Sequence, residues 1–224
     1  MNTARRTLLA AALALTAAGC AHAGAYDDFF RAIELDNGAQ VASLLRRGFD
    51  PNTRTAKREP ALVVALHKDS VQAAAVLLQS RGLDVNARNP KGETALMMAA
   101  IRGNLPAARA LIARDADVNQ QGWTPLHYAA SSTSDDAPAM VTLLLEHHAY
   151  IDAASPNGTT PLMMAVRNGL ADTARLLVRE GADPTLRNER GMTAVDFARQ
   201  AEREDMVELV AQAIRRRQPS RGKW

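Results

Sequence analysis

Two adjacent histidines and a nearby tyrosine, His147, His148 and Tyr150, form the group in this sequence with the clearest potential for chemistry. Imidazole nitrogens are the most common metal ligands in proteins, and both histidine and tyrosine can bind haem iron. This group therefore supports one functional hypothesis, a haem- or metal-handling protein. Adjacent residues of a helix, however, point to different faces, so the two rings are not expected to converge on one ion. We predict no metal and no cofactor, and keep the haem- or metal-handling protein as the alternative.

Motifs of known catalytic sites do not accompany these residues. The sequence contains no G-x-S-x-G nucleophile elbow, no H-E-x-x-H zinc motif and no G-x-x-x-x-G-K-[ST] phosphate-binding loop. Its one cysteine, Cys20, rules out an intramolecular disulfide and a multi-cysteine metal cluster. We therefore predict that the protein is not an enzyme and has no catalytic residues.

The charge balance differs between the ends of the chain and its body. The 224 residues include 27 Lys and Arg against 24 Asp and Glu, for a formal net charge of +3. The basic excess lies at the two ends, in Arg5 and Arg6 and in residues 215–223, so the body between them is acidic. Nucleic-acid binding relies on a basic surface. We therefore expect no nucleic acid partner.

The first residues have the pattern of an export signal. A basic start is followed by an apolar run at residues 7–18, which is shorter than the roughly 20 residues of a membrane span. An A-x-A match at residues 21–23 predicts a signal peptide at 1–23, with cleavage before Gly24. The alternative is a lipoprotein signal at 1–19 with Cys20 lipidated, which gives an outer-membrane lipoprotein facing the periplasm. Both alternatives predict a periplasmic protein with no membrane span.

The rest of the sequence repeats with a step of 33 or 34 residues. Each repeat carries a pair of aliphatic residues, followed by a helix-stop signal and then by a helix-start signal. The position after the second helix usually requires a left-handed backbone conformation, which glycine adopts most easily. In two repeats the residue at this position is Asp115 or His148 instead of glycine, and both residue types tolerate this conformation better than most. Near the end of the chain, Glu202 stands where a central repeat has a glycine. The pairs are Leu44-Leu45, Leu77-Leu78, Leu111-Ile112, Leu144-Leu145 and Leu177-Val178.

The helix-start signals carry a resemblance to a known family. Residues 124–129 read T-P-L-H-Y-A, residues 160–165 read T-P-L-M-M-A, and residues 94–99 read T-A-L-M-M-A. They match wholly or in part the T-P-L-H-x-A signature of the 33-residue ankyrin repeat, so the sequence resembles the ankyrin repeat family. The resemblance implies an all-α solenoid of helix-turn-helix repeats joined by short β-hairpin-like fingers. It implies a domain at 24–217 of about five repeats plus a C-terminal capping unit, with a flexible tail at 218–224.

One repeat departs from the common length. From Asp117 to Gly122 is five residues, against eight in the corresponding fingers, and the extra three residues of that repeat fall after Ala130. One interpretation is neutral variation in a loop. The other is a notch shaped for a partner.

The family resemblance also implies how the protein works. Ankyrin repeat proteins bind partner proteins through finger tips and the exposed side of the first helices, so we expect a monomeric, non-enzymatic interaction module in the bacterial periplasm. Resemblance to small exported ankyrin proteins implies support of a stress enzyme such as catalase, or neutralisation of a secreted effector. Trp123 is the strongest candidate contact, because tryptophan is enriched in interface hot spots. The full predicted set is Lys91, Glu93, Ile101, Arg102, Gln121, Trp123, Ser131, Ser132, Asn157, Arg167, Asn168 and Arg190.

Overall fold

The structure is a computed structural model that describes residues 24–217. The predicted signal peptide, Cys20 and the predicted tail at 218–224 lie outside the described residues. Between residues 24 and 217 the backbone forms helices and loops without a β-strand, and one isolated antiparallel bridge joins Arg54 to Pro60. The predicted all-α class is therefore confirmed. In the same range, no helix is long and apolar enough to cross a membrane.

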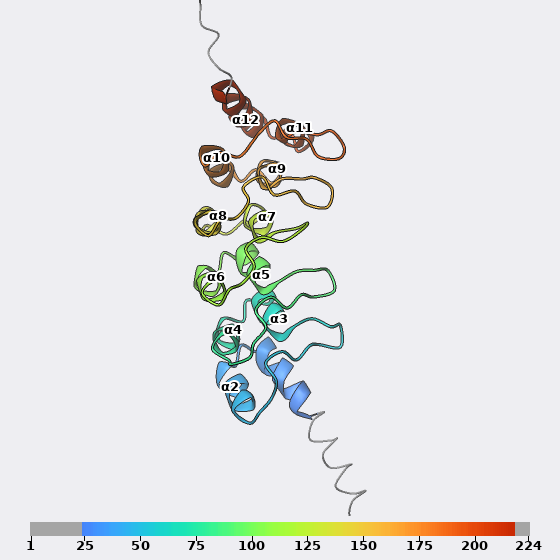
Figure 1. The fold of residues 1–224 in the computed structure, drawn as a ribbon, viewed down its shortest axis with the longest axis vertical. Coiled ribbons are helices and arrows are strands. Elements are labelled where there is room, and N and C mark those ends of the chain that lie inside the picture. Colours follow the sequence, from blue (N-terminus) through green and yellow to red (C-terminus); the bar gives the residue numbers. More distant parts are fainter. Residues whose placement is uncertain (1–23, 218–224) are drawn as a thin grey trace, which may run out of the picture. The chain divides into compact units, whose positions relative to one another are not determined.

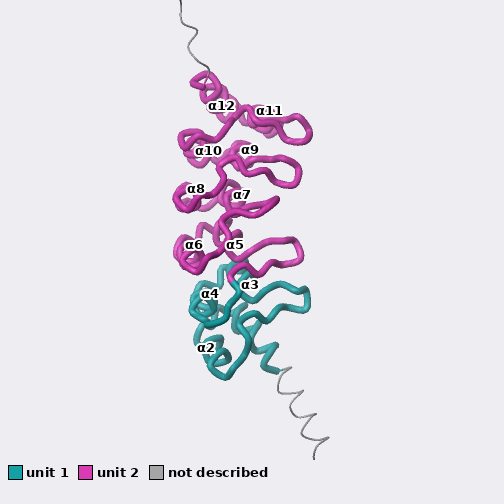
Figure 2. Tube along the Cα trace, viewed as in Figure 1, with its two compact units in different colours: residues 1–84 teal, residues 85–224 magenta. Residues whose placement is uncertain are grey.

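The chain divides into two compact units, residues 1–84 and 85–224 (Figure 2). The described part of the first unit begins with a helix at 24–34 and continues with α2 (Gly38–Arg46), α3 (Ala61–His67) and α4 (Val71–Leu78). Residues 85–217 of the second unit contain four helix pairs. They are α5 (Ala95–Arg102) with α6 (Leu105–Ile112), α7 (Pro125–Ala129) with α8 (Ala137–Glu146), α9 (Pro161–Arg167) with α10 (Ala171–Arg179), and α11 (Ala194–Gln200) with α12 (Glu204–Arg217).

Aromatic packing closes the core of the first unit. Phe29 and Ile33, on the helix at 24–34, are fully buried, and the ring centroids of Phe29 and Phe49 lie 4.5 Å apart. Val41 on α2 and Leu77 on α4 are also fully buried. The core of this unit therefore combines aromatic and aliphatic side chains.

The second unit is built as two rows of helices. The first helices α5, α7, α9 and α11 pack in one row, and the second helices α8, α10 and α12 pack in another (Figure 1). The leucine of each motif, Leu96, Leu126 and Leu162, is at most 1% exposed. Alanine three residues later, as at Ala129 and Ala165, is fully buried and lets neighbouring helices approach closely. The apolar face that the motif predicts is therefore the face that packs.

The predicted left-handed positions are confirmed. Asp115 has φ 61°, His148 has φ 63° and Glu202 has φ 54°. Only a minority of non-glycine residues adopt this conformation, and Asp and His tolerate it better than most. Asp115 and His148 follow the second helices α6 and α8, whereas Glu202 lies in the turn between α11 and α12.

Asparagine side chains join successive repeats at the start of these loops. Asn86 Nδ2 donates to the Asp115 carbonyl, and Asn86 Oδ1 accepts from the Asp117 N–H, at 3.1 and 2.8 Å. Asn119 makes the same pair of bonds with residues 148 and 150. A side-chain amide suits this place because it donates and accepts at once.

The last of these links between successive repeats uses a different pair of residues. Asp152 accepts from the Asp183 N–H at 2.9 Å but has no donor for the Gly181 carbonyl. Arg217, on α12, donates to that carbonyl at 3.1 Å and pairs with Asp183 at 3.0 Å. Burial raises the pKa of Asp152, against the lowering effect of the Asp183 N–H. Arg217 thereby ties the terminal helix to the repeat before it.

Candidate functional site

The start of α7 is capped by a buried histidine. His127 is 1% exposed, and its Nδ1 lies 3.2 Å from the Thr124 backbone nitrogen, while its Nε2 lies 2.9 Å from the Thr159 carbonyl oxygen. An N–H can only donate and a carbonyl can only accept, so the ring is neutral with its proton on Nε2. Burial lowers the pKa of His127. The ring therefore joins the start of α7 to the finger of the next repeat.

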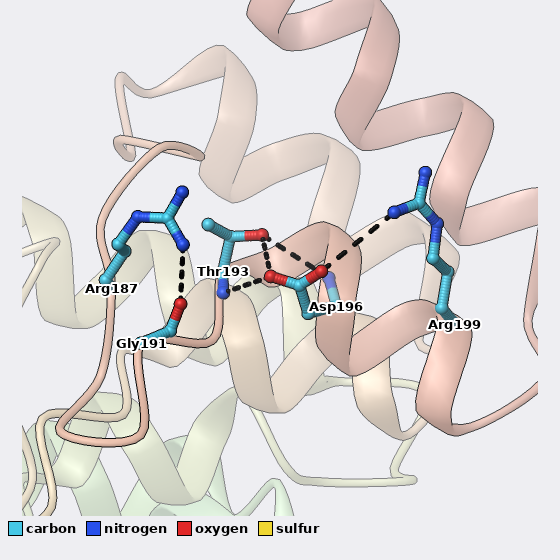
Figure 3. Close-up of polar contacts among 5 residues, drawn as sticks. All are labelled: Arg187, Gly191, Thr193, Asp196 and Arg199. Carbon is cyan, nitrogen blue, oxygen red and sulfur yellow. Dashed lines mark hydrogen bonds and ion pairs between the residues drawn. The ribbon is translucent and has the colours of Figure 1, made fainter.

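The start of α11 is capped by a carboxylate instead (Figure 3). Asp196 Oδ2 accepts from the Thr193 N–H at 2.8 Å and from the Thr193 hydroxyl at 2.7 Å. The Thr193 N–H, and then its hydroxyl, lower the pKa of Asp196. Arg199 lies 4.0 Å from the same carboxylate, and Arg187 donates to the Gly191 carbonyl within the finger (Figure 3). All of these bonds stay within one repeat.

The short finger before α7 closes by a side chain. The fingers before α5, α9 and α11 each close by a backbone bond of 3.0 Å, as from the Asn188 N–H to the Met192 carbonyl. In the short finger, Gln120 Nε2 donates to the Trp123 carbonyl at 2.7 Å. Gln120 Oε1 is buried and has no hydrogen-bond partner among residues 24–217. This finger is three residues shorter than the others, and a side-chain bond replaces the backbone bond that closes them.

An apolar pocket of about 270 Å³ lies beside the short finger, on the row of first helices. Trp123 is 36% exposed, and its ring meets the His127 ring edge-on with 5.3 Å between centroids. The pocket is lined by Ile101 from α5, by Trp123, His127, Tyr128 and Ser131 from the finger, α7 and the turn after it, and by Met164 from α9.

One wall of the pocket is held by a hydrogen-bond chain to the preceding finger. The Tyr128 hydroxyl donates to Glu93 Oε1 at 2.9 Å, and Asn89 Nδ2 donates to Glu93 Oε2 at 2.6 Å. Burial raises the pKa of Tyr128, and the bond to Glu93 adds to that effect. The Tyr128 ring is therefore fixed in place as a wall, and Glu93 serves as its support.

The predicted contact residues fall into three groups. Trp123, Ile101 and Ser131 meet in the pocket. Glu93 is half-buried in the chain to Tyr128, and Ser132 is 1% exposed and donates to the Ile101 carbonyl at 2.8 Å, so Ser132 offers no surface to a partner. The remaining side chains are exposed on fingers and first-helix ends: Lys91, Arg102, Gln121, Asn157, Arg167, Asn168 and Arg190.

Three pocket residues, His127, Tyr128 and Met164, are not among the predicted contacts. Tyr128 and Met164 occupy equivalent places in successive T-P-L motifs, three residues after the proline. Tyr128 precedes Ser131 by three residues, and Met164 precedes Arg167 by the same step, so each pair shares a helix face. That spacing was the signal in the sequence that could have found them.

The histidine pair lies at the end of α8. His148 takes the left-handed position at the end of α8, and its carbonyl accepts from Asn119 at 2.8 Å. Across residues 24–217, no group of three His, Cys, Asp or Glu side chains is placed to hold a metal ion. His147, His148 and Tyr150 are all exposed and do not line the pocket.

A second, larger hollow of about 600 Å³ lies between α10 and α12. Its lining includes three arginines, each of which is paired with a carboxylate, and the apolar side chains of Val178 and Leu209; the arginines are Arg175, Arg179 and Arg217. None of the predicted contact residues lines it.

Comparisons with known proteins agree with this architecture. Among curated proteins, the chain is 40% identical over 85 residues to human BCL-6 corepressor-like protein 1, covering 37% of this chain and 5% of that protein. It is 39% identical over 84 residues to the chicken nuclear factor NF-kappa-B p105 subunit, covering 36% and 8%. The chain thus spans less than a tenth of either relative.

The comparison with solved structures covers far more of the chain. A chain in the complex of the predatory endopeptidase Bd0816 from Bdellovibrio bacteriovorus with the immunity protein Bd3460 matches with a TM-score of 0.71 and 26% identity. The match covers 83% of this chain and 97% of that one. The family model for ankyrin repeats matches three times, at residues 29–120, 76–154 and 134–217. With its T-P-L motifs, paired helices and fingers, this chain belongs to the ankyrin repeat family.

Proposed function

We propose that this protein is an exported, non-enzymatic binding module that neutralises a partner protein, such as a secreted effector enzyme, in the bacterial periplasm. The pocket around Trp123 carries the proposal. It leaves a tryptophan 36% exposed over an apolar hollow, on the face that the family uses for partner proteins. Central aromatic residues in such hollows are the usual hot spots of protein interfaces.

The likeness to a solved complex supports the neutralising role. The matched chain belongs to a complex of an endopeptidase with an immunity protein, and it is similar over nearly its whole length. An immunity-type role suits this chain because its surface chemistry consists of packing and charge, without a catalytic motif in the sequence. The periplasmic location rests on the signal pattern at residues 1–23.

Affinity capture tests this proposal. The tagged chain is incubated with a cell-envelope extract of its own organism, and bound proteins are identified by mass spectrometry. Three baits are compared: the wild type, the double variant Trp123→Ala with Arg102→Ala, and Tyr150→Ala, which removes an exposed aromatic side chain that does not line the pocket. We expect one stoichiometric partner that the double variant loses and Tyr150→Ala keeps.

The captured partner is then assayed for its own activity with increasing amounts of this chain. Loss of activity at one equivalent supports neutralisation. A partner that keeps or gains activity favours a supporting role. Retention of the same partner by the double variant would show that the pocket is not the binding site.

A further inference from the structure

We infer that the pocket around Trp123 takes a single apolar side chain from an acidic segment of the partner, with carboxylates of that segment meeting Arg167 and Lys91. This inference rests on the proposed function and gives the chemistry of the partner. Three observations support it: the volume of the pocket, the basic side chains at its edge, and the hydrogen bonds that hold the carboxylate of Glu93.

The size of the pocket selects a side chain. Sites that enclose a small molecule typically measure about 300–1,000 Å³, and this pocket, at about 270 Å³, falls just below that range. The polar side-chain groups of its lining residues are the Trp123 indole N–H, the Ser131 hydroxyl, which donates to the His127 carbonyl, and the polar atoms of His127 and Tyr128, which are already bonded. A phenylalanine, leucine or methionine side chain suits a lining with so few polar groups.

The charge around the pocket selects the flanking residues. Arg167 follows the pocket residue Met164 by one helical turn on the same face of α9, and Arg102 follows Ile101 on α5. Lys91 lies at the turn of the preceding finger. Arg167 and Lys91 are exposed, and neither side chain has a hydrogen-bond or ion-pair partner among the described residues. Their charges are available to a partner.

Acidic residues of the same segments do not cancel these charges. In residues 85–103, 118–131 and 153–168, the one acid is Glu93, which is held by Tyr128 and Asn89. Asp152, at the base of the next finger, accepts a bond from the Asp183 N–H. Exposed Asp135 and Asp136 lie in the loop after Ser131 and mark the end of the basic region. A partner's carboxylates are therefore attracted to the side of Arg167 and Lys91, and repelled from the α7–α8 loop.

Short blocked peptides test this chemistry on the full chain. The first carries a central phenylalanine between glutamates, the second replaces phenylalanine with alanine, and the third replaces the glutamates with lysines. Binding is followed by the indole N–H resonance of Trp123, assigned by its absence in Trp123→Phe. We expect saturable shifts with the first peptide at about 1 mM, and at least tenfold weaker binding by the other two.

Matched arginine variants locate the charge. Arg167→Gln is expected to weaken binding of the first peptide about two- to fivefold, the range of an exposed ion pair. Arg175→Gln, on the second-helix row, is expected to leave binding unchanged. Raising the salt concentration should weaken binding by the wild type more than by Arg167→Gln.

Equal binding of the lysine peptide, or no shift of the Trp123 resonance by the first peptide, would overturn this inference. The capture experiment separates that failure from failure of the proposed function. A partner lost with the Trp123→Ala double variant would still support the pocket as a binding site. In that case the partner would present a different surface to it.

Discussion

The starts of α7 and α11 carry out the same task with different chemistry. At α7, the His127 ring caps the helix and also reaches the Thr159 carbonyl in the next repeat. At α11, the Asp196 carboxylate bonds only to Thr193 of its own repeat and lies near Arg199 (Figure 3). The cap of α7 can bond to the finger of the repeat that follows it. In contrast, α11 belongs to the last helix pair of the described residues. The central cap therefore couples neighbours, and the terminal cap is local and partly exposed.

Removing the coupled cap gives the largest expected effect. His127→Ala leaves the Thr124 N–H without a partner in a buried place and creates a cavity; the Thr159 carbonyl loses the bond from the ring and keeps the one from the Ser155 N–H. We expect a loss of about 3 kcal/mol in the free energy of unfolding, measured by urea denaturation. The reference variant is His127→Met, because Met163 occupies the same place in the next repeat, where its sulfur lies 3.4 Å from the Thr160 nitrogen.

His127→Met should restore part of the lost stability, because methionine fills the space and its sulfur can take the place of Nδ1 beside the Thr124 N–H. The one bond still lost is that from the ring to the Thr159 carbonyl, which keeps its bond from the Ser155 N–H. A loss below 1 kcal/mol for His127→Ala would mean that coupling between these repeats does not depend on the ring.

The two caps also predict two separate pH windows. Burial lowers the pKa of His127 in the folded state, so between the unfolded pKa, about 6.5, and that lower value the unfolded chain binds the extra proton. Stability from this group is complete above pH 6.5 and falls as the pH drops, with a slope of at most about 1.4 kcal/mol per pH unit. The pKa of Asp196 is also lowered, so its contribution is lost only below about pH 4.

Urea denaturation of the wild type and His127→Met between pH 7.5 and 5 measures the first window. The variant should show a flatter dependence, and equal slopes in the two proteins would contradict the assignment to His127.

Removing the local cap should cost less. Asp196→Ala deletes the acceptor of the Thr193 N–H and hydroxyl, but both groups are close to water, because the Asp196 side chain is 39% exposed. We expect a loss of about 1 kcal/mol in the free energy of unfolding. Asp196→Asn keeps an acceptor oxygen and serves as the control, with a smaller loss. A loss as large as that of His127→Ala would mean that α11 is not locally stabilised.

Much of this comparison was accessible from the sequence. The 33-residue step and the T-P-L motifs predicted the helix pairs, and glycine replacement predicted the left-handed Asp115 and His148. These features depend on residues within one repeat. Local backbone preference and the spacing of apolar residues were enough to predict them.

The parts that were missed depend on residues far apart in the sequence. Glu93 looked like an exposed finger residue, but Tyr128, 35 positions later, donates to it. Ser132 looked exposed at a helix end, but it bonds to the Ile101 carbonyl 31 positions earlier. Arg217 donates to the Gly181 carbonyl, the bond that Asp152 cannot supply because a carboxylate has no donor. Such contacts are set by which side chains the packed repeats bring together, and a single repeat does not reveal them.

The smallest expected effect concerns the short finger. Gln120→Ala removes the bond to the Trp123 carbonyl, which is worth about 1 kcal/mol. It also removes Gln120 Oε1, a buried acceptor that has no partner among residues 24–217 and costs a similar amount. The two terms oppose each other, so the free energy of unfolding should change by less than about 0.5 kcal/mol.

The long finger before α11 provides the control. Asn188 Oδ1 accepts from the N–H groups of Arg190 and Met192, both at 3.0 Å. Asn188→Ala removes these bonds without removing an unpaired buried acceptor, so it should lower the free energy of unfolding. If Gln120→Ala instead costs as much as Asn188→Ala, a bound water satisfies Oε1, and the short finger is as firmly closed as the long ones.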